Sequence, residues 1–492
     1  MHIEPDERIR SPLRLWSLRE DVLVEVDEEL GQLLIATEWG EIRLPDPGPT
    51  VRESLWRMQL GPTSLANVLG DDGANADKAN WQRFEEVLGA LRHCVVHSLD
   101  RQTGDGPLLS AVPIARNADF VLPNLTGEDV VRISRFTAMR AGNGELVLES
   151  PLARHRMVVH YSLAAWVSGA INRPMTVRDL AEAVQVPRPL VTLIVAYLVA
   201  AGMAVLGENG VPADEALFAE DSDPDLIPWS HADLMFHTHS RSGRYQGPIG
   251  ADHPGAGVLP PAPVVKTIPP GRRFVLVRPD LTTPSIADPK LSEVIENRRS
   301  FHRFADEPPT VDQLGELLYR TARIRSSKRL VAGDDEYVVS DRPYPSVGGL
   351  HELELYLTID RCAGLPHGIY HYDPVGHALT LINTAEAECD EMLDAARIAA
   401  GSVARPPALI TMTARIARLS WLYSGIAYST ALKHVGVLQQ TLYLVATAMN
   451  LAPCALAVGD TEIATSALRL RWPVEVSVGE FVIGLRPIDT VN

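Results

Sequence analysis

A stretch dense in proline and glycine divides this chain of 492 residues into two halves. Residues 246–290 read "QGPIGADHPGAGVLPPAPVVKTIPPGRR", a short link, and then "RPDLTTPSIADPK". Because proline fixes its own φ angle and lacks an amide proton, such a stretch predicts an extended connector rather than a helix. A chain of this length also exceeds one ordinary hydrophobic core. We therefore predict an α+β protein with a small α+β module (1–130), a winged-helix-like module (131–245), the connector (246–290) and a larger domain (291–492).

The composition excludes several classes of protein. Hydrophobic residues make up 46% of the chain and charged residues 22%, which predicts a soluble globular protein. The net charge of −17 repels phosphate backbones and anionic lipid, so we expect neither a nucleic-acid nor a membrane partner. Two uncharged stretches, 189–206 and 435–459, are interrupted by glycine, or by glutamine, asparagine and proline, and predict buried helices that run into strands.

Compartment and metal content follow from two further patterns. The amino-terminal segment "MHIEPDERIRSPLRLW" has acidic residues where an export signal needs a basic and then an apolar run, so a cytoplasmic location is expected. The four cysteines are widely spaced, without a C-x-x-C pair or a histidine at zinc-ligand spacing. No metal site is predicted.

Residues 133–206 carry the clearest pattern of the front half. "ISRFTAMRAGNGELVLESP" predicts strand, turn and strand, and "SLAAWVSGAI" predicts a helix. "TVRDLAEAV" has Thr176 and Asp179 at capping-box spacing, and "RPLVTLIVAYLVAAG" predicts a longer helix that ends at Gly202, followed by the strand "MAVLGE". This is the order of a winged helix.

A winged helix raises the question of DNA binding, which the second of its helices argues against. A helix in the major groove needs arginine, lysine, asparagine or glutamine on its exposed face. After Arg188 this helix offers only Thr192 and Tyr197 among aliphatic residues. Packing or peptide docking is therefore the favoured role.

The back half alternates helical and strand-like patterns. We expect helices at 291–297, 310–322, 385–402 and 427–450, and strands at "LELYLTI", "GIYHYDPVGHALTLI" (a hairpin), "PALITMTA", "PCALAVG" and "EFVIGL".

A cationic cluster begins this half. In "NRRSFHRF" the residues Arg298, Arg299, Ser300, His302 and Arg303 follow a predicted helix and precede the strand-like "RFADE". Guanidinium groups and a hydroxyl in one tight segment suit a phosphate, because arginine can bind two oxygens at once. A solvated charged turn is the alternative interpretation.

Two more segments bear on that choice. In "RPYPSVGGLHELELYLTI", Pro345, Ser346, Gly348 and Gly349 form a loop through which backbone amides can approach a flat ligand, although a hairpin turn would look the same. In "EFVIGLRP", Arg486 is either a surface charge or a second clamp on the phosphate. The chain has no G-x-S-x-G, no Walker loop, no H-E-x-x-H and no G-x-G-x-x-G.

Together these motifs resemble a known family. "RRSFHRF" resembles the R-R-S-x-R-x-[FY] motif of the nitroreductase-like flavoenzymes, which bind FMN, and "YPSVGGLHELELYL" resembles the corresponding loop of their SagB/ThcOx-type azoline dehydrogenase branch. "LVLESPLA" and "WSHADLMFHTHSRSGR" are similar to its upstream region, so the likeness covers about 133–492. Extensions like the first 110 residues can resemble leader-peptide recognition modules in related enzymes, which makes 1–130 a candidate peptide-recognition module.

The resemblance implies a set of cofactor contacts. FMN phosphate would be held by Arg298, Ser300 and Arg486, with Arg299 near the phosphate or ribityl chain. Pro345, Ser346, Gly348 and Gly349 would lie along the isoalloxazine ring. Gln440 matches one residue of a Q-N pair, and Gly459 is what remains of a glycine-rich stretch near the flavin edge.

Two departures from the family pattern bear on chemistry. His302 stands where a permanent cation is expected. The Lys-Tyr pair that the family places before the long helix is Leu422 and Tyr423 here, so Tyr423 acts alone or Lys433 or His434 supplies the base.

The function that the resemblance implies is an FMN-dependent dehydrogenase that oxidises thiazoline or oxazoline rings in a ribosomally made peptide. It further implies a homodimer, a precursor peptide as substrate and cyclodehydratase proteins as partners. Two alternatives stay open: a nitro- or quinone reductase fed by NAD(P)H, and a non-catalytic peptide-binding scaffold.

Overall fold

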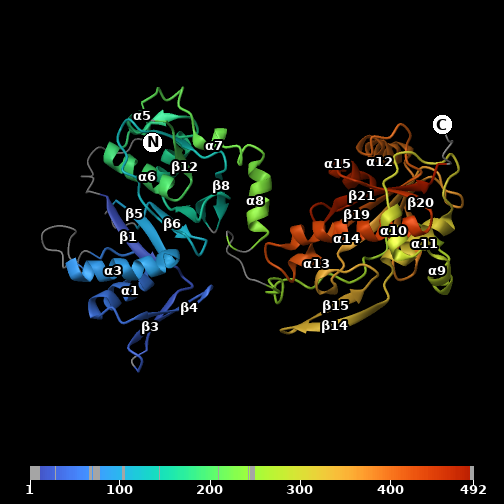
Figure 1. The fold of residues 1–492 in the computed structure, drawn as a ribbon, viewed down its shortest axis with the longest axis horizontal. Coiled ribbons are helices and arrows are strands. Elements are labelled where there is room, and N and C mark those ends of the chain that lie inside the picture. Colours follow the sequence, from blue (N-terminus) through green and yellow to red (C-terminus); the bar gives the residue numbers. More distant parts are fainter. Residues whose placement is uncertain are drawn as a thin grey trace. The chain divides into compact units, whose positions relative to one another are not determined.

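The chain forms two compact units, Met1–Gln246 and Gly247–Asn492, each of which is described by itself (Figure 1). The computed structural model describes residues 12–487 except 28, 66–68, 70–77, 102–105, 143, 209, 242 and 244–249, and it describes no side chains at 283–285. The division between units falls at the beginning of the proline- and glycine-rich stretch, and the described part of that stretch belongs to the second unit.

The first unit is built on an antiparallel sheet that joins the two predicted front modules. Strands from before and after residue 130 lie side by side in it, so the boundary expected between 130 and 131 does not separate two units. In spatial order the sheet is β1 (Leu13–Leu18), β5 (Val95–Asp100), β6 (Leu109–Pro113), β10 (His155–Val159), β9 (Glu145–Glu149) and β8 (Ala138–Gly142).

Two small sheets and the helices complete this unit. One sheet is the meander β2 (Leu23–Asp27), β3 (Gln32–Thr37) and β4 (Gly40–Pro45); the other has the order β11 (Met175–Thr176), β7 (Val130–Ile133) and β12 (Ala204–Leu206). The helices are α1 (Pro49–Leu60), α3 (Lys78–Leu91), the 3-10 turn η1 (Arg92–Cys94), α4 (Ser162–Ala170), α5 (Val177–Val184), α6 (Arg188–Ala200), α7 (Ala219–Ser222) and α8 (His231–His239).

The local predictions for 133–206 agree with these elements. β8 and β9 form the predicted strand pair, and Thr176 caps α5 by accepting a hydrogen bond from the Asp179 amide at 3.0 Å. The order helix, helix, strand is observed as α5, α6 and β12. That this module is a winged helix stays a prediction, because the order of the elements alone does not identify that fold.

The uncharged stretch of α6 is part of a hydrophobic core. Leu190, Val191, Ile194 and Val195 are buried there. Among the described residues, no single helix is long and apolar enough to cross a bilayer, and α5 with α6 meets those criteria only as a pair bent by 117°.

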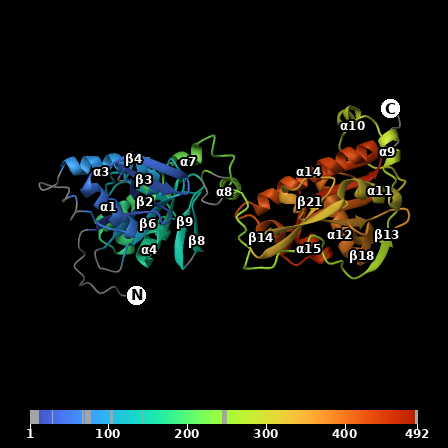
Figure 2. The ribbon, with the colours of Figure 1, turned by 90° about the horizontal axis from the view of Figure 1, so that it is seen from below.

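The second unit has three layers around one antiparallel sheet. α11 and α14 cover one face of the sheet, and α12 and α15 cover the other (Figure 2). The strand order is β13 (Arg272–Val275), β18 (Ala378–Asn383), β17 (Gly368–Asp373), β16 (Leu353–Ile359), β19 (Ala408–Arg415), β21 (Glu475–Leu485) and β20 (Leu451–Leu456). The remaining elements are α9 (Thr282–Ala287), α10 (Leu291–Asn297), α11 (Val311–Ala322), the hairpin β14 (Ser326–Ala332) and β15 (Asp335–Asp341), η2 (Val347–Gly349), α12 (Glu386–Ala399), α13 (Ala417–Ser420), α14 (Ala427–Ala448) and α15 (Thr461–Ala467).

The central strand β16 has no exposed face. Every residue of β16 is buried, because helices cover both sides of the sheet at that point. Leu355 and Leu357 contact the core under α11 and α14, whereas Tyr356 contacts the core under α12 and α15.

Two expectations for this unit are wrong. The stretch 246–290 is not a connector throughout: β13 pairs with β18 at one edge of the sheet, and α9 is a short helix. Residues 303–307, "RFADE", form no strand, although Ala305 donates its amide to Leu485 O at 3.0 Å.

Candidate functional site

Three predicted arginines come together at the end of α14. The Arg299 and Arg486 guanidinium groups both lie over the Phe301 ring, at 4.9 and 5.3 Å from its centroid, and Arg298 lies 5.2 Å from the Tyr443 centroid. Burial and then the charge of Arg299 lower the pKa of Arg486. In the described part of the chain none of the three forms an ion pair with a carboxylate, so the cluster is suited to an external anion.

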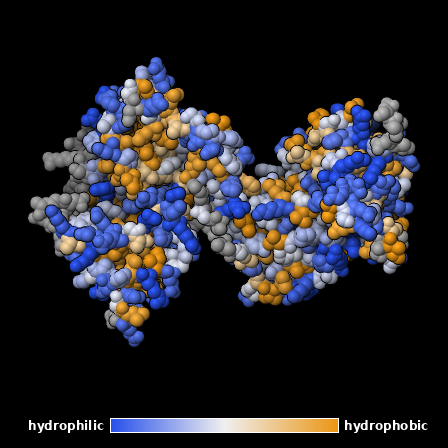
Figure 3. Space-filling view, in the orientation of Figure 1, coloured by the Kyte–Doolittle hydropathy of each residue, from blue (hydrophilic) through white to orange (hydrophobic). Residues whose placement is uncertain are grey.

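A hydroxyl pair completes this anion cluster, which we define as Arg298, Arg299, Ser300 and Arg486. Ser300 Oγ lies 2.7 Å from Tyr443 Oη, which also accepts a hydrogen bond from the Ala455 amide at 2.7 Å. Tyr443 can therefore donate its proton to Ser300, which leaves the Ser300 proton for an anion. Figure 3 shows hydrophilic residues gathered on the face of this unit over α10 and β20.

His302 does not join the anion cluster in the same way. Its Nδ1 donates to Ala400 O, 2.6 Å away, at the carboxyl end of α12. The ring is therefore held by a helix on the other face of the sheet, and the expectation that His302 replaces a phosphate-binding cation has no support in its contacts. Arg303 is exposed.

The loop 345–349 has the backbone shape that its glycines suggest. Gly348 and Gly349 have φ of 60° and 67°, in the left-handed region that favours glycine. A Cβ on Gly349 would lie 3.1 Å from Ser340 O, so the loop also packs closely on β15. Pro345 is exposed and Ser346 half-buried, with Ser346 Oγ accepting from the His351 amide at 3.0 Å.

His434 holds this loop in place. Its Nε2 lies 2.9 Å from the Val347 amide, and its Nδ1 lies 2.8 Å from a Glu352 carboxylate oxygen. Because the amide can only donate, Nε2 must accept, and the proton sits on Nδ1 and is donated to Glu352. Both side chains are buried, at 4% and 0% exposed. With both nitrogens engaged, His434 positions the loop in this structure and has no free lone pair for a substrate proton.

Tyr423 lies against the same loop. Its hydroxyl would be 3.3 Å from a Cβ on Gly348, so the phenol lies directly beside the backbone of the loop. Burial, and secondarily Tyr337, raises the pKa of Tyr423 above its ordinary value. A protonated phenol at neutral pH can donate a hydrogen bond, and it becomes a base only as the pH rises.

The other predicted residues lie elsewhere. Lys433 and Gln440 are exposed on α14, where Gln439 rather than Gln440 makes a contact, to Glu480 O at 3.3 Å. A Cβ on Gly459 would overlap the Glu480 carboxylate, which gives this glycine a packing reason. Burial raises the pKa of Glu480.

The anion cluster and the loop 345–349, which we call the glycine loop, contact different points along α14. His434 contacts the loop and Tyr443 contacts Ser300, and nine residues of helix between them rise about 13 Å. Within one chain, only an elongated ligand with an anionic end could touch both.

Sequence reasoning missed Glu352 and Tyr443. Glu352 had a signal, since a carboxylate in the otherwise apolar "HELELYL" must be paired when its strand is buried. Tyr443 had only a weak one, as an aromatic residue with a polar tip near the end of an apolar helix. Among the described residues, no group of three or more His, Cys, Asp and Glu is placed to hold a metal.

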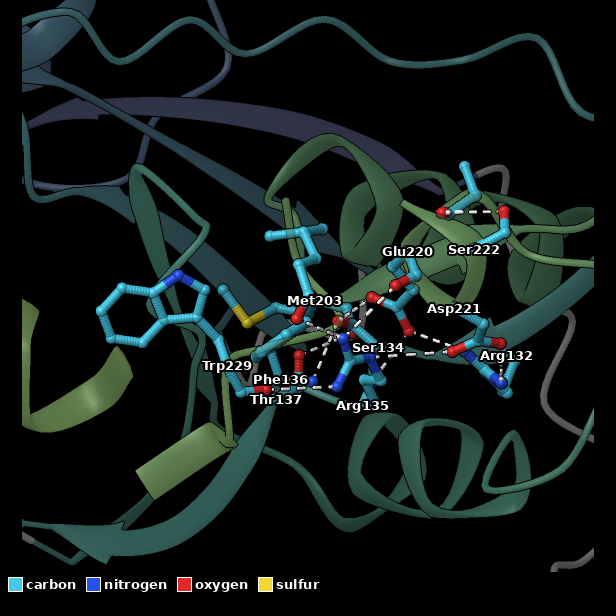
Figure 4. Close-up of polar contacts among 12 residues, drawn as sticks. Arg132, Ser134, Arg135, Phe136, Thr137, Met203, Glu220, Asp221, Ser222 and Trp229 are labelled. Carbon is cyan, nitrogen blue, oxygen red and sulfur yellow. Dashed lines mark hydrogen bonds and ion pairs between the residues drawn. The ribbon is translucent and has the colours of Figure 1, made fainter. Parts of the chain in front are cut away.

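A second polar network lies in the first unit, around Glu220 (Figure 4). The Glu220 carboxylate, 5% exposed, accepts from Arg132 Nη2 at 2.6 Å, Ser134 Oγ at 2.6 Å and the Arg135 amide at 2.9 Å. Asp221 pairs with Arg132 at 2.8 Å. These bonds fasten the segment around α7 to the strand that contains Arg132.

Comparison with protein families assigns part of each unit. The model of the cyanobactin oxidase ThcOx matches residues 131–246, and the model of the nitroreductase family matches residues 295–484. The chain joins a ThcOx-type segment to a nitroreductase-family domain. The predicted α+β class with a carboxyl-terminal nitroreductase-like domain is thereby confirmed, and the segment before that domain is related to cyanobactin oxidase.

Individual relatives are distant. A putative nitroreductase of Methanocaldococcus jannaschii is 24% identical over 185 residues, which is 37% of this chain and 87% of that protein. A putative nitroreductase from Ralstonia eutropha is 21% identical over 46% of this chain and 98% of that one, with a TM-score of 0.35. A chain of the Escherichia coli microcin synthetase McbBCD complex with truncated pro-MccB17 bound is 18% identical over 44% of this chain and 76% of that one, with a TM-score of 0.32. The family models, not these structural scores, assign the domains.

The nitroreductase-family match covers Arg298, Arg299 and Ser300 of the anion cluster, the glycine loop and the long helix, and it ends two residues before Arg486. The ThcOx match covers the Glu220 network, including "SRF" at 134–136. Residues 12–130 lie outside both matches.

Proposed function

We propose that this protein is an FMN-dependent dehydrogenase that oxidises thiazoline or oxazoline rings of a peptide to thiazoles or oxazoles. The observation that carries the proposal is the anion cluster, three arginines without an acidic partner among the described residues, in a nitroreductase-family domain. The ThcOx-type segment favours heterocycles in a peptide over nitro compounds as the substrate. A cytoplasmic location belongs to the same proposal.

The residues present fit FMN at both of its ends. Arg298, Ser300 and Arg486 would hold the phosphate, with Arg299 beside it. The loop at Gly348 and Gly349 would present backbone to the flat ring, since a side chain at Gly348 would narrow the space beside the Tyr423 hydroxyl. When bound, FMN accepts the hydride that the azoline ring loses as it becomes aromatic.

The chain's own part is to orient the ring and take up a proton. The buried pair of Glu352 and His434 fixes the loop, so that its backbone presents one shape. Tyr423 is the proposed proton acceptor because its hydroxyl borders Gly348. Its raised pKa means that the phenolate is scarce at neutral pH and that the rate should rise with pH.

A precursor peptide and a cyclodehydratase are the proposed partners, with the first unit as the peptide-binding part. A groove of about 520 Å³ lies beside the strand β4, lined by Leu44–Gly48 on one side and by Arg83, Glu86 and Val87 of α3 on the other. Among the described strands β4 pairs only with β3, so its outer edge can accept an extended peptide as an added strand. The opposite edge is partly covered, because Gln59 accepts from the Val24 amide at 3.1 Å.

Pairing of two copies is part of the same proposal. The separation between the anion cluster and the glycine loop along α14 would be explained if each site used one part from each copy. α14 has an exposed face that includes Leu432, Lys433 and Gln440. Light scattering on the purified protein measures the mass directly, and a monomer would exclude this arrangement.

The test of the function begins with the absorbance spectrum of the purified protein. We expect a yellow protein that releases FMN on denaturation and that, with an azoline-containing peptide, removes the mass of two hydrogens per ring, read by mass spectrometry. A protein that binds no flavin after incubation with FMN would exclude the proposal.

A second candidate is a nitro- or quinone reductase fed by NAD(P)H, favoured by the match of 295–484 to the nitroreductase family as a whole. Rapid bleaching of bound flavin by NADPH, without turnover of an azoline peptide, would support it.

A further inference from the structure

The chain segment that leads into the second unit is fastened to the loop that carries Tyr423. We call residues 252–264 the strap. The Asp252 carboxylate accepts from the Ser424 amide at 3.0 Å and from Ser424 Oγ at 2.5 Å. The Asp252 and His253 amides both donate to Leu422 O at 3.1 Å. The residues on either side of Tyr423 are thus held by the first two residues of the strap.

Trp421 anchors the next part of the strap. Its carbonyl accepts from the Gly255 amide at 3.2 Å, and its Nε1 donates to Leu259 O at 2.8 Å. The indole is 4% exposed, and a Cβ on Gly255 would overlap it. Only glycine therefore allows the strap to cross the tryptophan this closely.

Arg418 connects the strap to the glycine loop. This buried side chain donates from Nη1 to Ala262 O at 2.8 Å and from Nε to Leu350 O at 3.0 Å. Leu350 directly follows Gly348 and Gly349. One side chain therefore spans the strap and the loop that faces Tyr423.

We propose that Asp252 is a positioning residue, which sets the Tyr423 hydroxyl against the Gly348 backbone by clamping Ser424. This deepens the proposed function and rests on it. Four hydrogen bonds from two strap residues fix the main chain at Leu422 and Ser424, whereas the Tyr423 side chain itself is only half-buried. Without the carboxylate, nothing else described in the structure accepts from the Ser424 amide and hydroxyl, so the segment gains freedom at the residue next to Tyr423.

The first test is a double-mutant cycle on single-turnover ring oxidation. Asp252→Ala should slow the step about tenfold, the usual effect of losing a charge-assisted hydrogen bond. Asp252→Asn, which keeps an acceptor for the Ser424 amide, should recover most of the rate. In a Tyr423→Phe background, Asp252→Ala should have no further effect, because the role of Asp252 passes through the tyrosine.

The controls separate positioning from general damage. Flavin content should be the same in all variants, and Asp334→Ala, at an exposed turn between β14 and β15, should behave as the unchanged protein. The proposal is overturned if Asp252→Ala leaves the rate unchanged, or slows the Tyr423→Phe enzyme as much as the unchanged one.

A second readout needs no azoline turnover. The ultraviolet difference titration between a protein and its Tyr423→Phe counterpart isolates the ionisation of Tyr423. The titratable groups near it are Tyr337 of β15, which acts on its pKa, and Asp252 and His253 of the strap, which bond to the residues on either side of it. Asp252→Ala should bring the Tyr423 pKa back toward its ordinary value, since burial is the main cause of the raised pKa and the freed segment opens to solvent. An unchanged titration refutes the positioning role. If no variant oxidises azolines, the proposed function fails, and this titration still decides the role of Asp252.

Discussion

At the scale of single residues, the half-buried Phe301 is unusual because its ring contacts two guanidinium groups at once. Arg299 and Arg486 are brought together over it although their charges repel, and the pKa of Arg486 is lowered as a result of burial and of that repulsion. Such an arrangement is stabilised when an anion joins it.

Removing two of these cations should release the cofactor. In Arg298→Ala with Arg486→Ala, we expect FMN affinity to fall by more than about a hundredfold, because each charge-assisted bond contributes about 1.5–3 kcal/mol. The ratio of flavin to protein absorbance after gel filtration measures this. Arg325→Ala with Arg329→Ala, both exposed on or beside β14, removes the same charge elsewhere and should keep the flavin. Full retention in the first double mutant would refute the phosphate site.

Tyr423→Phe should keep the flavin and slow ring oxidation at least about a hundredfold, the lower end of the usual range for loss of a general base. Because burial raises the Tyr423 pKa, the rate in the unchanged enzyme should rise with pH into the alkaline range, and the variant should lose that rise. The pH profile of single-turnover oxidation checks this. A variant with an unchanged profile would exclude Tyr423 as the base.

Glu480 gives a pH-dependent stability prediction. Burial raises its pKa in the folded state, so the folded protein binds the proton more tightly than the unfolded chain, and stability falls as pH rises through the unfolded value toward the folded one. Glu480→Gln, which cannot ionise, should therefore be more stable than the unchanged protein at pH near 7. In urea unfolding the difference should disappear below the ordinary carboxyl pKa of about 4.5. An equal or lower stability at neutral pH would contradict this.

At the scale of elements, most of the second unit could be predicted from patterns in the sequence. β16 was expected at "LELYLTI" and α10 at 291–297, and both have those bounds. β13 could not be predicted, since "RRFV" follows two prolines and its only strand signal is the pairing with β18, which is distant in sequence. "RFADE" was wrongly expected as a strand: alanine, aspartate and glutamate are uncommon in strands, and among the described residues its backbone amides donate one hydrogen bond, from Ala305 to Leu485 O.

The candidate site divides in the same way. The sequence brought Arg298, Ser300 and Arg486 into one hypothesis, and the fold places them together. The sequence could not reveal that both ring nitrogens of His434 are hydrogen-bonded, to Glu352 and Val347, because those bonds depend on how α14 is aligned with the glycine loop. The same limit applies to His302, whose partner on α12 is 98 residues away.

Glu220 is the buried carboxylate that attaches the α7 segment. Glu220→Ala leaves Ser134 and the Arg135 amide without their acceptor and leaves Arg132 with Asp221 alone, and we expect the free energy of unfolding to fall by about 3 kcal/mol, typical for breaking a buried charged network. Thermal unfolding and hydrogen exchange of 217–230 measure it. Glu215→Ala, on an exposed carboxylate nearby, serves as the control. Unchanged exchange in the Glu220 variant would show that other contacts hold the segment.

At the scale of the whole molecule, the family matches and the compact units do not begin at the same residues. The nitroreductase match begins at 295, whereas the unit that contains it begins at Gly247. The residues between include β13 and the strap, which supply an edge strand and the bonds to Trp421, Ser424 and Arg418.

The strap and β13 therefore determine where a stable fragment of this protein can begin. A fragment of residues 247–492 should be expressed in soluble form and take up FMN, whereas a fragment of 291–492, with every flavin motif present, should aggregate. The shorter piece exposes the side of β18 and leaves the Arg418 guanidinium without one of its buried acceptors. Comparable solubility and flavin uptake by the two fragments would contradict this. For the same reason, related domains that are expressed from the first residue of the family match would lose these stabilising contacts. Active enzymes among them would aggregate before they could be assayed.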